Sequence, residues 1–222
     1  MNPLSAGLNF LHEGGLVMYP LLFCAILSVG VMIERFITIS RAGADNEVMA
    51  QQVKEHLQRG QIKEALQRCD EHPGPVSAII ANGIRNRNLD SDSIERAMEE
   101  LALRETPQLY KRLGTLDTII TIAPLLGLLG TVTGMIKAFS VISSPSGLNN
   151  PTGITGGVAQ ALLATATGLA IAIVTLVGYN YLTERVKEII AEMEIRATQV
   201  MNILANLRGG EGIRSEAATN RD

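Results

Sequence analysis

The chain has no tryptophan, and aromatic residues make up only 4% of its 222 residues. Proteins that bind single-stranded nucleic acid stack the bases on aromatic side chains, so this composition argues against a nucleic-acid partner. Cysteine is also scarce, because the chain has only Cys24, in an apolar segment, and Cys69, in a polar one. No disulfide framework follows from two cysteines placed in this way.

Signatures of soluble enzymes are missing as well. His12 and Glu13 begin like the zinc-binding motif HExxH, but Leu16 stands where the second histidine is required. The glycine-rich stretch at 209–212 lacks the lysine of a phosphate-binding loop, and no GxSxG motif occurs. We therefore expect no metal, no cofactor and no catalysis by this chain alone.

Charge is absent from long parts of the chain. Residues 1–33 contain no Lys or Arg, and between residues 118 and 183 the only charged residue of either sign is Lys137. By contrast, 12 of the 19 Lys and Arg residues lie in residues 34–112. Because an unpaired charge inside a bilayer costs several kcal/mol, this segregation predicts a chain that alternates between membrane and water.

Three apolar segments reach the length of about 20 residues that a helix needs to cross about 30 Å of hydrocarbon. They are residues 16–36, 116–137 and 158–183. Cytoplasmic loops carry an excess of Lys and Arg, which places residues 37–115 and the C-terminal part in the cytoplasm and residues 1–15 and 138–157 outside. Glu13, without any Lys or Arg before the first segment, is the reverse of the start of a signal peptide, so we expect this segment to be retained.

Between the first two apolar segments, the sequence predicts short amphipathic helices. Apolar residues recur at helical spacing over residues 46–69, interrupted by Gly60, which indicates two helices. The His-Pro-Gly-Pro sequence at 72–75 predicts where they end.

A further helix is expected to begin near Asp92. This residue can cap the helix, with Glu95 three residues later completing a capping box. Pro107 is expected to kink or restart this helix before it continues into the second apolar segment.

After the third apolar segment, apolar residues alternate at spacings of four and three, as in a coiled-coil seam. They are Val186, Ile190, Met193, Ala197, Val200, Leu204 and Leu207. The pattern predicts one unbroken helix from about Val158 to Leu207, in which residues 184–208 extend beyond the membrane. The seam can pack on the chain's own helices or on another subunit. Residues 209–222 are polar and are predicted to be a disordered tail.

Small residues form one face of the second apolar segment. Gly127, Gly130 and Gly134 are spaced i, i+3 and i+7, so they share one side of a helix and let a second helix approach closely. Together with Pro124 and with Gly168 of the third segment, they are the candidate helix-packing residues.

Two threonines in these segments have a second possible role. Thr131 and Thr165 can bond to a carbonyl of the preceding turn, as threonine in a membrane helix often does. Their hydroxyl groups can instead face water or a partner helix in a pore.

The last two apolar segments resemble the MotA/TolQ/ExbB proton-channel family. The resemblance rests on GLLGTVTGM at 127–135, preceded by Ala123-Pro124, and on AQALLATATGLAIAI at 159–173, followed by Tyr179-Asn180. Flagellar MotA-type subunits have four transmembrane helices, so three spans point to the ExbB/TolQ branch.

The resemblance implies a homopentameric ring in the bacterial inner membrane. The ring would surround the single transmembrane helices of two ExbD- or TolR-like subunits, each with an Asp that takes up protons. Proton flow would then energise a TonB- or TolA-like protein. The family threonines that line the pore correspond to Thr131 and Thr165.

Gln160 departs from the family pattern, which usually has Glu at this position. A carboxamide forms hydrogen bonds but does not titrate in the relevant pH range. Three interpretations are open: the partner's Asp and waters on Thr131 and Thr165 suffice, an engineered change traps one state, or the protein conducts poorly and serves as an anchor.

Asp117, at the cytoplasmic start of the second span, also has two interpretations. It can be an interfacial residue paired with Arg112 or Lys111, or it can receive protons that leave the pore.

We therefore expect an all-α integral membrane protein with three transmembrane helices, of which the second and third extend into a cytoplasmic helical domain. The expected function is that of a ring subunit in a proton-driven motor. Candidate pathway residues are Thr131, Thr165, Gln160 and Asp117. Membrane lipids are further expected partners. The alternative function is that of a passive membrane scaffold that displays the region 37–112 to cytoplasmic partners.

Overall fold

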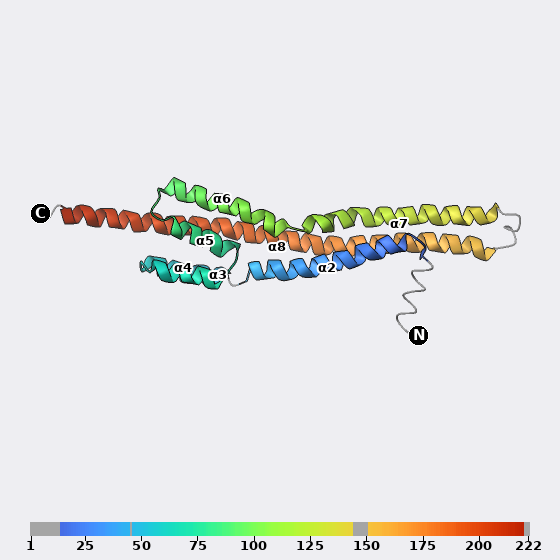
Figure 1. Cartoon of the computed structure of the whole chain (residues 1–222), viewed down its shortest axis with the longest axis horizontal. Coiled ribbons are helices and arrows are strands. Elements are labelled where there is room, and N and C mark those ends of the chain that lie inside the picture. The colour runs from blue at the N-terminus through green and yellow to red at the C-terminus, as the bar shows by residue number, and fades with distance from the viewer. Residues whose placement is uncertain (1–13, 45, 144–150, 220–222) are drawn as a thin grey trace. The chain divides into compact units, whose positions relative to one another are not determined.

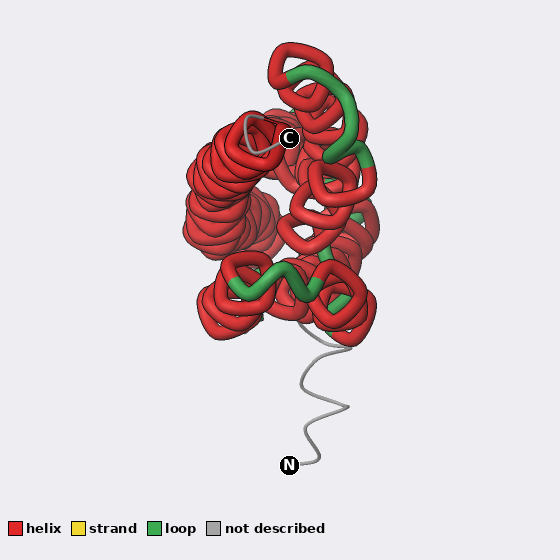
Figure 2. Tube along the Cα trace, turned by 90° about the vertical axis from the view of Figure 1, so that its left-hand side faces the viewer, coloured by secondary structure: helices red, strands yellow, loops and turns green. Residues whose placement is uncertain are grey.

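The structure is a computed structural model in which residues 14–44, 46–143 and 151–219 are described, with side chains described for 152–207 of the last range. This part of the chain is almost entirely helical and contains no strand, as Figures 1 and 2 show. Its main helices are α2 (Met18–Ala42), α3 (Asn46–Gln58), α4 (Ile62–Glu71), α5 (Pro75–Arg85), α6 (Ser91–Tyr110), α7 (Leu113–Ile142) and α8 (Pro151–Thr219).

The expected all-α membrane architecture is confirmed. Within the described residues, three helical stretches are long and apolar enough to cross a membrane. The first contains α2, the second contains α7 and the third lies within α8, so they match the three segments that length and charge predict. Each helix is longer than its predicted span, because the backbone stays helical after the apolar run has ended.

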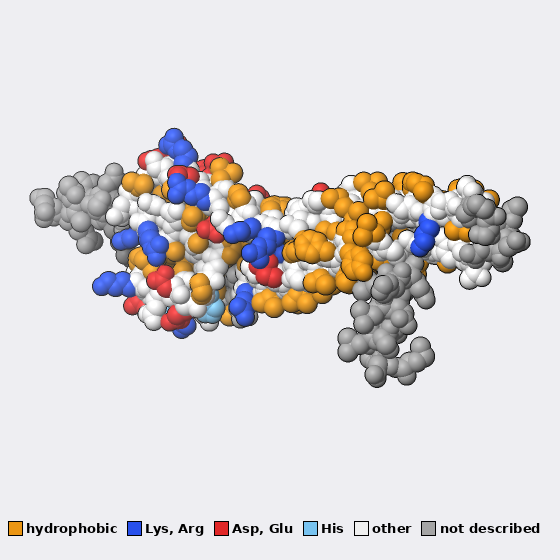
Figure 3. Space-filling model, turned by 45° about the vertical axis from the view of Figure 1, so that its right-hand side comes forward, with side chains coloured by type: hydrophobic (Ala, Val, Ile, Leu, Met, Phe, Trp, Pro, Cys, Tyr) orange, Lys and Arg blue, Asp and Glu red, His pale blue; other side chains and the backbone are white. Residues whose placement is uncertain are grey.

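The chain divides into two compact units. The first, which we call the apolar unit, consists of Met1–Arg35 and Arg112–Leu182. The second, which we call the polar unit, consists of Phe36–Lys111 and Thr183–Asp222. On the face shown in Figure 3, charged side chains gather over the polar unit and are sparse over α7.

The apolar unit has a small core and a large apolar surface. Residues of α2 and the turn before it pack against α7 and α8 in a cluster of Val17, Met18, Leu21, Ile119, Ala123 and Ala172. Many large apolar side chains remain outside, for example Leu125, Leu162 and Val177, each more than half exposed. A surface of this kind is a liability in water but suits a hydrocarbon environment or contact with further apolar helices.

In the polar unit, α3 and α4 form the predicted pair of short helices. Gly60 lies between them with a φ of 76°, a left-handed conformation that glycine adopts without strain. The pair ends at Glu71, where the breaker cluster was expected to end it. Helix α5 follows directly and is missing from the sequence-based expectation, although eight of its 11 residues are buried.

Helix α6 begins and ends differently from the expectation. Its N-cap is Asp90, whose carboxylate accepts a hydrogen bond from the Ser93 N–H at 3.1 Å, so Asp92 is not the cap. Pro107 lies inside the helix and does not restart it. The break lies after Tyr110, where Arg112 adopts a φ of 65° that few residues other than glycine tolerate.

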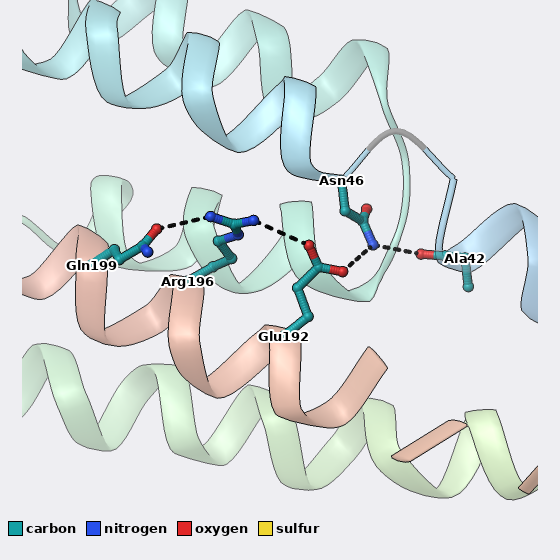
Figure 4. Close-up of polar contacts among 5 residues, drawn as sticks. All are labelled: Ala42, Asn46, Glu192, Arg196 and Gln199. Atoms are coloured by element: carbon teal, nitrogen blue, oxygen red, sulfur yellow. Dashed lines mark hydrogen bonds and ion pairs between the residues drawn. The ribbon is translucent and has the colours of Figure 1, made fainter. Parts of the chain in front are cut away.

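A polar network ties the start of α3 to α8 within the polar unit (Figure 4). The buried Asn46 amide donates to the Ala42 carbonyl at 3.1 Å and to the Glu192 carboxylate at 3.2 Å. Arg196 lies on the other side of Glu192 at 3.5 Å and donates to Gln199 at 3.1 Å. The carboxylate of Glu192 is thus held from both sides.

Helix α8 is unbroken, as the heptad pattern predicts, and starts earlier, at Pro151. Val186, Met193, Val200 and Leu204 of the seam are buried in the chain itself, whereas the remaining three seam residues are half-buried. The seam therefore packs mainly on the chain's own helices. The helix extends to Thr219, past the predicted start of the disordered tail at 209, and that tail stays a prediction because side chains after residue 207 lie outside the described part.

Candidate functional site

Helices α7 and α8 lie so close together that only glycine fits at several positions of their contact. A Cβ atom on Gly168 would lie 2.5 Å from the Ala123 carbonyl oxygen. A Cβ atom on Gly134 would lie 2.8 Å from the Gly157 carbonyl oxygen, and one on Gly127 would lie 3.1 Å from a backbone oxygen of α8. The small-residue face of α7 is therefore the face that contacts α8.

Gly130 and Pro124 also lie on α7. Gly130 is buried against the methyl group of Ala164. Pro124 is half-buried within the helix, and because proline has no N–H, the carbonyl of Ile120 loses its helical hydrogen bond there.

Thr165 contacts α7 at Gly127, about one helical turn before Thr131. The Thr165 hydroxyl is 3.0 Å from the Gly127 carbonyl oxygen across the contact and 3.4 Å from the Ala161 carbonyl oxygen of its own helix. The Thr131 hydroxyl donates to the Leu128 carbonyl oxygen at 2.6 Å. Each hydroxyl oxygen can still accept hydrogen bonds, so both side chains can hold water at a half-buried position.

Lys137 and Gln160 make a second polar contact between the helices. The Lys137 ammonium donates to the Gln160 side-chain oxygen at 3.1 Å. An ammonium group only donates, so the carboxamide must turn its oxygen to Lys137 and its NH₂ away. That NH₂ lies against Gly15, whose φ of 74° and lack of a side chain leave room for it. Gln160 thus bridges α7 and the turn that precedes α2.

The threonine pair and the lysine-glutamine pair lie on opposite edges of the α7–α8 contact. At about 100° per residue, Lys137 is about 120° from Thr131 around α7, and Gln160 is about 140° from Thr165 around α8. Helical geometry therefore places Thr131 and Thr165 on the same edge, about one turn apart along α7, and Gln160 on the other edge.

Asp117 is exposed near the start of α7. Its backbone carbonyl accepts a hydrogen bond from the Thr121 hydroxyl at 3.2 Å. Arg112, one of its two expected partners, forms an ion pair with Glu34 at 3.2 Å instead. Across the described residues, no ion pair involves the Asp117 carboxylate.

Two features of the apolar unit were not expected from the sequence. The first is the contact between Lys137 and Gln160, which are 23 residues apart. The second is the cluster in which Glu34 pairs with both Arg35, at 2.6 Å, and Arg112. The adjacent opposite charges of Glu34 and Arg35, at the end of an apolar run, are the only signal in the sequence that could have drawn attention to this cluster.

The described part of the chain contains no group of three or more His, Cys, Asp or Glu side chains that could hold a metal ion. The polar groups of the apolar unit described above include hydroxyl, carboxamide and ammonium groups, together with the carboxylates of Glu34 and Asp117.

Comparison with known proteins places these features in a family. The model of the MotA/TolQ/ExbB proton channel family matches residues 71–195. One relative is a protein of Methanothermobacter thermautotrophicus that is named as a homologue of the biopolymer transport protein ExbB. It is 32% identical over 192 residues, which cover 85% of this chain and 67% of that protein. The biopolymer transport protein exbB1 of Vibrio cholerae is 28% identical over 188 residues, covering 81% of this chain and 80% of that protein.

A third relative is named for the Tol-Pal system. The Tol-Pal system protein TolQ of Haemophilus influenzae is 38% identical over 94 residues, 42% of this chain and 41% of that protein. The match to the family model spans more than half of the chain and includes α7 and the membrane part of α8. The chain therefore belongs to the MotA/TolQ/ExbB proton channel family, in its ExbB/TolQ branch.

Proposed function

We propose that this chain is the ring-forming subunit of a proton-driven complex in a bacterial inner membrane. Five copies surround the single helices of an ExbD- or TolR-like dimer, and the complex energises a TonB- or TolA-like protein. The N-terminus is periplasmic and the C-terminus cytoplasmic. The proposal rests on the position of Thr131 and Thr165 on one edge of the close-packed α7–α8 pair. Between residues 118 and 183 this pair has only one charged residue, Lys137.

The two threonines serve as the hydrated side of the pathway. Their hydroxyl groups accept hydrogen bonds from water at half-buried positions, while the surrounding apolar side chains exclude it. An Asp on the partner helix is costly in such surroundings when ionised and much less so when protonated. Protonation thus lets the partner helix move past the apolar wall of the ring, and release of the proton on the other side completes the cycle.

Gln160 acts in this account as a structural bridge. Its oxygen is held by Lys137 and its NH₂ group lies over Gly15, so the carboxamide joins the ends of α7, α8 and the turn before α2. A group that does not titrate suits that role, since its hydrogen bonds stay the same as protons pass. Proton transfer then depends on the threonine edge and on the partner's carboxylate.

Asp117 receives protons at the cytoplasmic end. Its carboxylate is exposed on α7 and forms no ion pair within the described residues, so it is available to exchange protons with water. Asp117→Asn should slow transport and leave assembly unchanged, and a variant with normal transport would remove this role.

The test of the whole proposal is purification together with an ExbD- or TolR-like subunit, followed by counting of the copies by native mass spectrometry. We expect a complex with five copies of this chain and two of the partner. A chain that purifies as a monomer and binds no such partner would contradict the proposal and favour a passive scaffold.

A further inference from the structure

A groove of about 620 Å³ lies in the polar unit between α6 and α8. Methionine side chains make up much of its apolar lining: Met98 from α6, and Met193 and Met201 from α8. Met98 and Met193 are almost completely buried, whereas Leu103, also in the lining, is 69% exposed. The groove therefore has an apolar base and an apolar side chain that stands open to solvent.

Among the described residues, three carboxylates line the same groove and no basic side chain does. Glu95 and Glu99 come from α6, and Glu194 comes from α8. Arg96, the arginine nearest to Glu95 and Glu99 along α6, donates to the Asp92 carbonyl oxygen at 3.1 Å. Arg196, the arginine nearest to Glu194 along α8, forms an ion pair with Glu192. Within the described part of the chain, the three lining carboxylates take part in no ion pair. The lining thus presents three exposed carboxylates to a partner that binds in the groove.

The length of the groove matches a short helix. Its lining extends over residues 95–106 of α6 and 190–202 of α8. At 1.5 Å per residue these stretches are about 16–18 Å long, which is the length of a helix of about 12 residues, or about three turns.

We propose that this groove binds a basic amphipathic helix of about three turns that belongs to another protein. Its apolar face would contact Leu103 and Met201, and the flexible, polarisable side chains of Met98 and Met193 beneath them would adapt to a helix laid in the groove. Lys or Arg residues flanking that face would reach the three glutamates, and opposite charges at a rim favour this partner over acidic ones. The proposal rests on the polar unit alone and stands whether or not the chain conducts protons.

The test uses the full chain in nanodiscs of neutral phosphatidylcholine and fluorescence anisotropy with synthetic helical peptides. The first peptide, about 12 residues long, carries Leu at helical spacing and Lys elsewhere. A second has the same composition in scrambled order, and a third has Glu in place of Lys. We expect the first peptide to bind at least about tenfold more tightly than either of the others, with an affinity that falls as salt is raised.

Charge reversal tells groove binding from general attraction. Glu99→Lys with Glu194→Lys should weaken binding of the first peptide at least about tenfold. The matched control, Glu47→Lys with Glu64→Lys, makes the same change in net charge at exposed positions of α3 and α4 and should bind as the original chain does.

Three results would overturn the proposal. Equal weakening by both double variants would show that net charge alone attracts the peptide. Equal binding of the scrambled peptide would show that the groove does not recognise an apolar face. A chain that does not bind the first peptide, and whose subunit number changes in the groove variant only, would show that a second copy of this chain covers the groove.

Discussion

Replacement of Gly168 by alanine tests the helix contact on which the account depends. The added Cβ atom would lie 2.5 Å from the Ala123 carbonyl oxygen, a backbone atom that cannot rotate away. A normal carbon-oxygen contact is about 3.4 Å, so α7 would have to retreat by about 1 Å. Overpacking of this kind costs about 1–3 kcal/mol, and the displacement would also stretch the 3.0 Å contact from Thr165 to Gly127.

The assay is the free energy of unfolding of the purified chain in detergent, with Gly156→Ala as the matched control. Gly156 lies on the same helix, and a Cβ atom there would meet nothing within 4 Å. We expect Gly168→Ala to lose about 1–3 kcal/mol and the control to lose nothing or to gain slightly from alanine's helix propensity. Equal stabilities for the two variants would refute the close contact between α7 and α8.

Other predictions address single side chains. Thr165→Val removes the hydroxyl that contacts Gly127, so it should lower the free energy of unfolding by about 0.6 kcal/mol and reduce proton flux. Thr165→Ser keeps a hydroxyl and should preserve the stability and the flux. Equal flux in the two variants would contradict a role of the Thr165 hydroxyl in the proton pathway. Gln160→Glu should leave proton flux in vesicles unchanged, because the bridge to Lys137 becomes an ion pair with the same geometry; a large rise in flux would show that the missing carboxylate limits transport. Burial raises the pKa of the Cys69 thiol to about 11, so alkylation near neutral pH, followed by mass spectrometry, should be at least about a hundredfold slower in the native than in the unfolded chain. The same shift means that stability falls as pH rises above the thiol's ordinary pKa toward 11, since the native state holds that proton more tightly.

The membrane architecture could be predicted from the sequence because its physical cause is local. A charge in hydrocarbon is so costly that the scarcity of charge over residues 118–183 marks the last two spans directly. The glycine face of α7 was visible for a similar reason, since the spacing of Gly127, Gly130 and Gly134 places them on one side of any helix. The break between α3 and α4 could be predicted from the presence of Gly60 alone, because glycine interrupts a helix.

Other features depend on contacts that a single sequence does not contain. The pairing of Lys137 with Gln160 follows from the register of α7 against α8, and no periodicity in either helix predicts it. Helix α5 was missed because the Pro-Gly-Pro sequence at 73–75 was interpreted only as the end of the preceding pair, whereas Pro75 is also the first residue of α5, a position that proline favours. The helix break that lies at Arg112 was predicted at Pro107, because an arginine with a left-handed backbone conformation has no sequence signature. The ion pair of Arg112 with Glu34 was not predictable either, because Glu34 belongs to a helix far away in sequence.

The most direct test of the central claim is proton flux into vesicles that contain this chain and an ExbD- or TolR-like subunit, followed with a pH-sensitive dye inside the vesicles. Under an imposed proton-motive force, we expect flux that requires both proteins and that is lost when the partner's membrane Asp is replaced by Asn. An assembled complex of the two proteins that passes no protons would contradict the account.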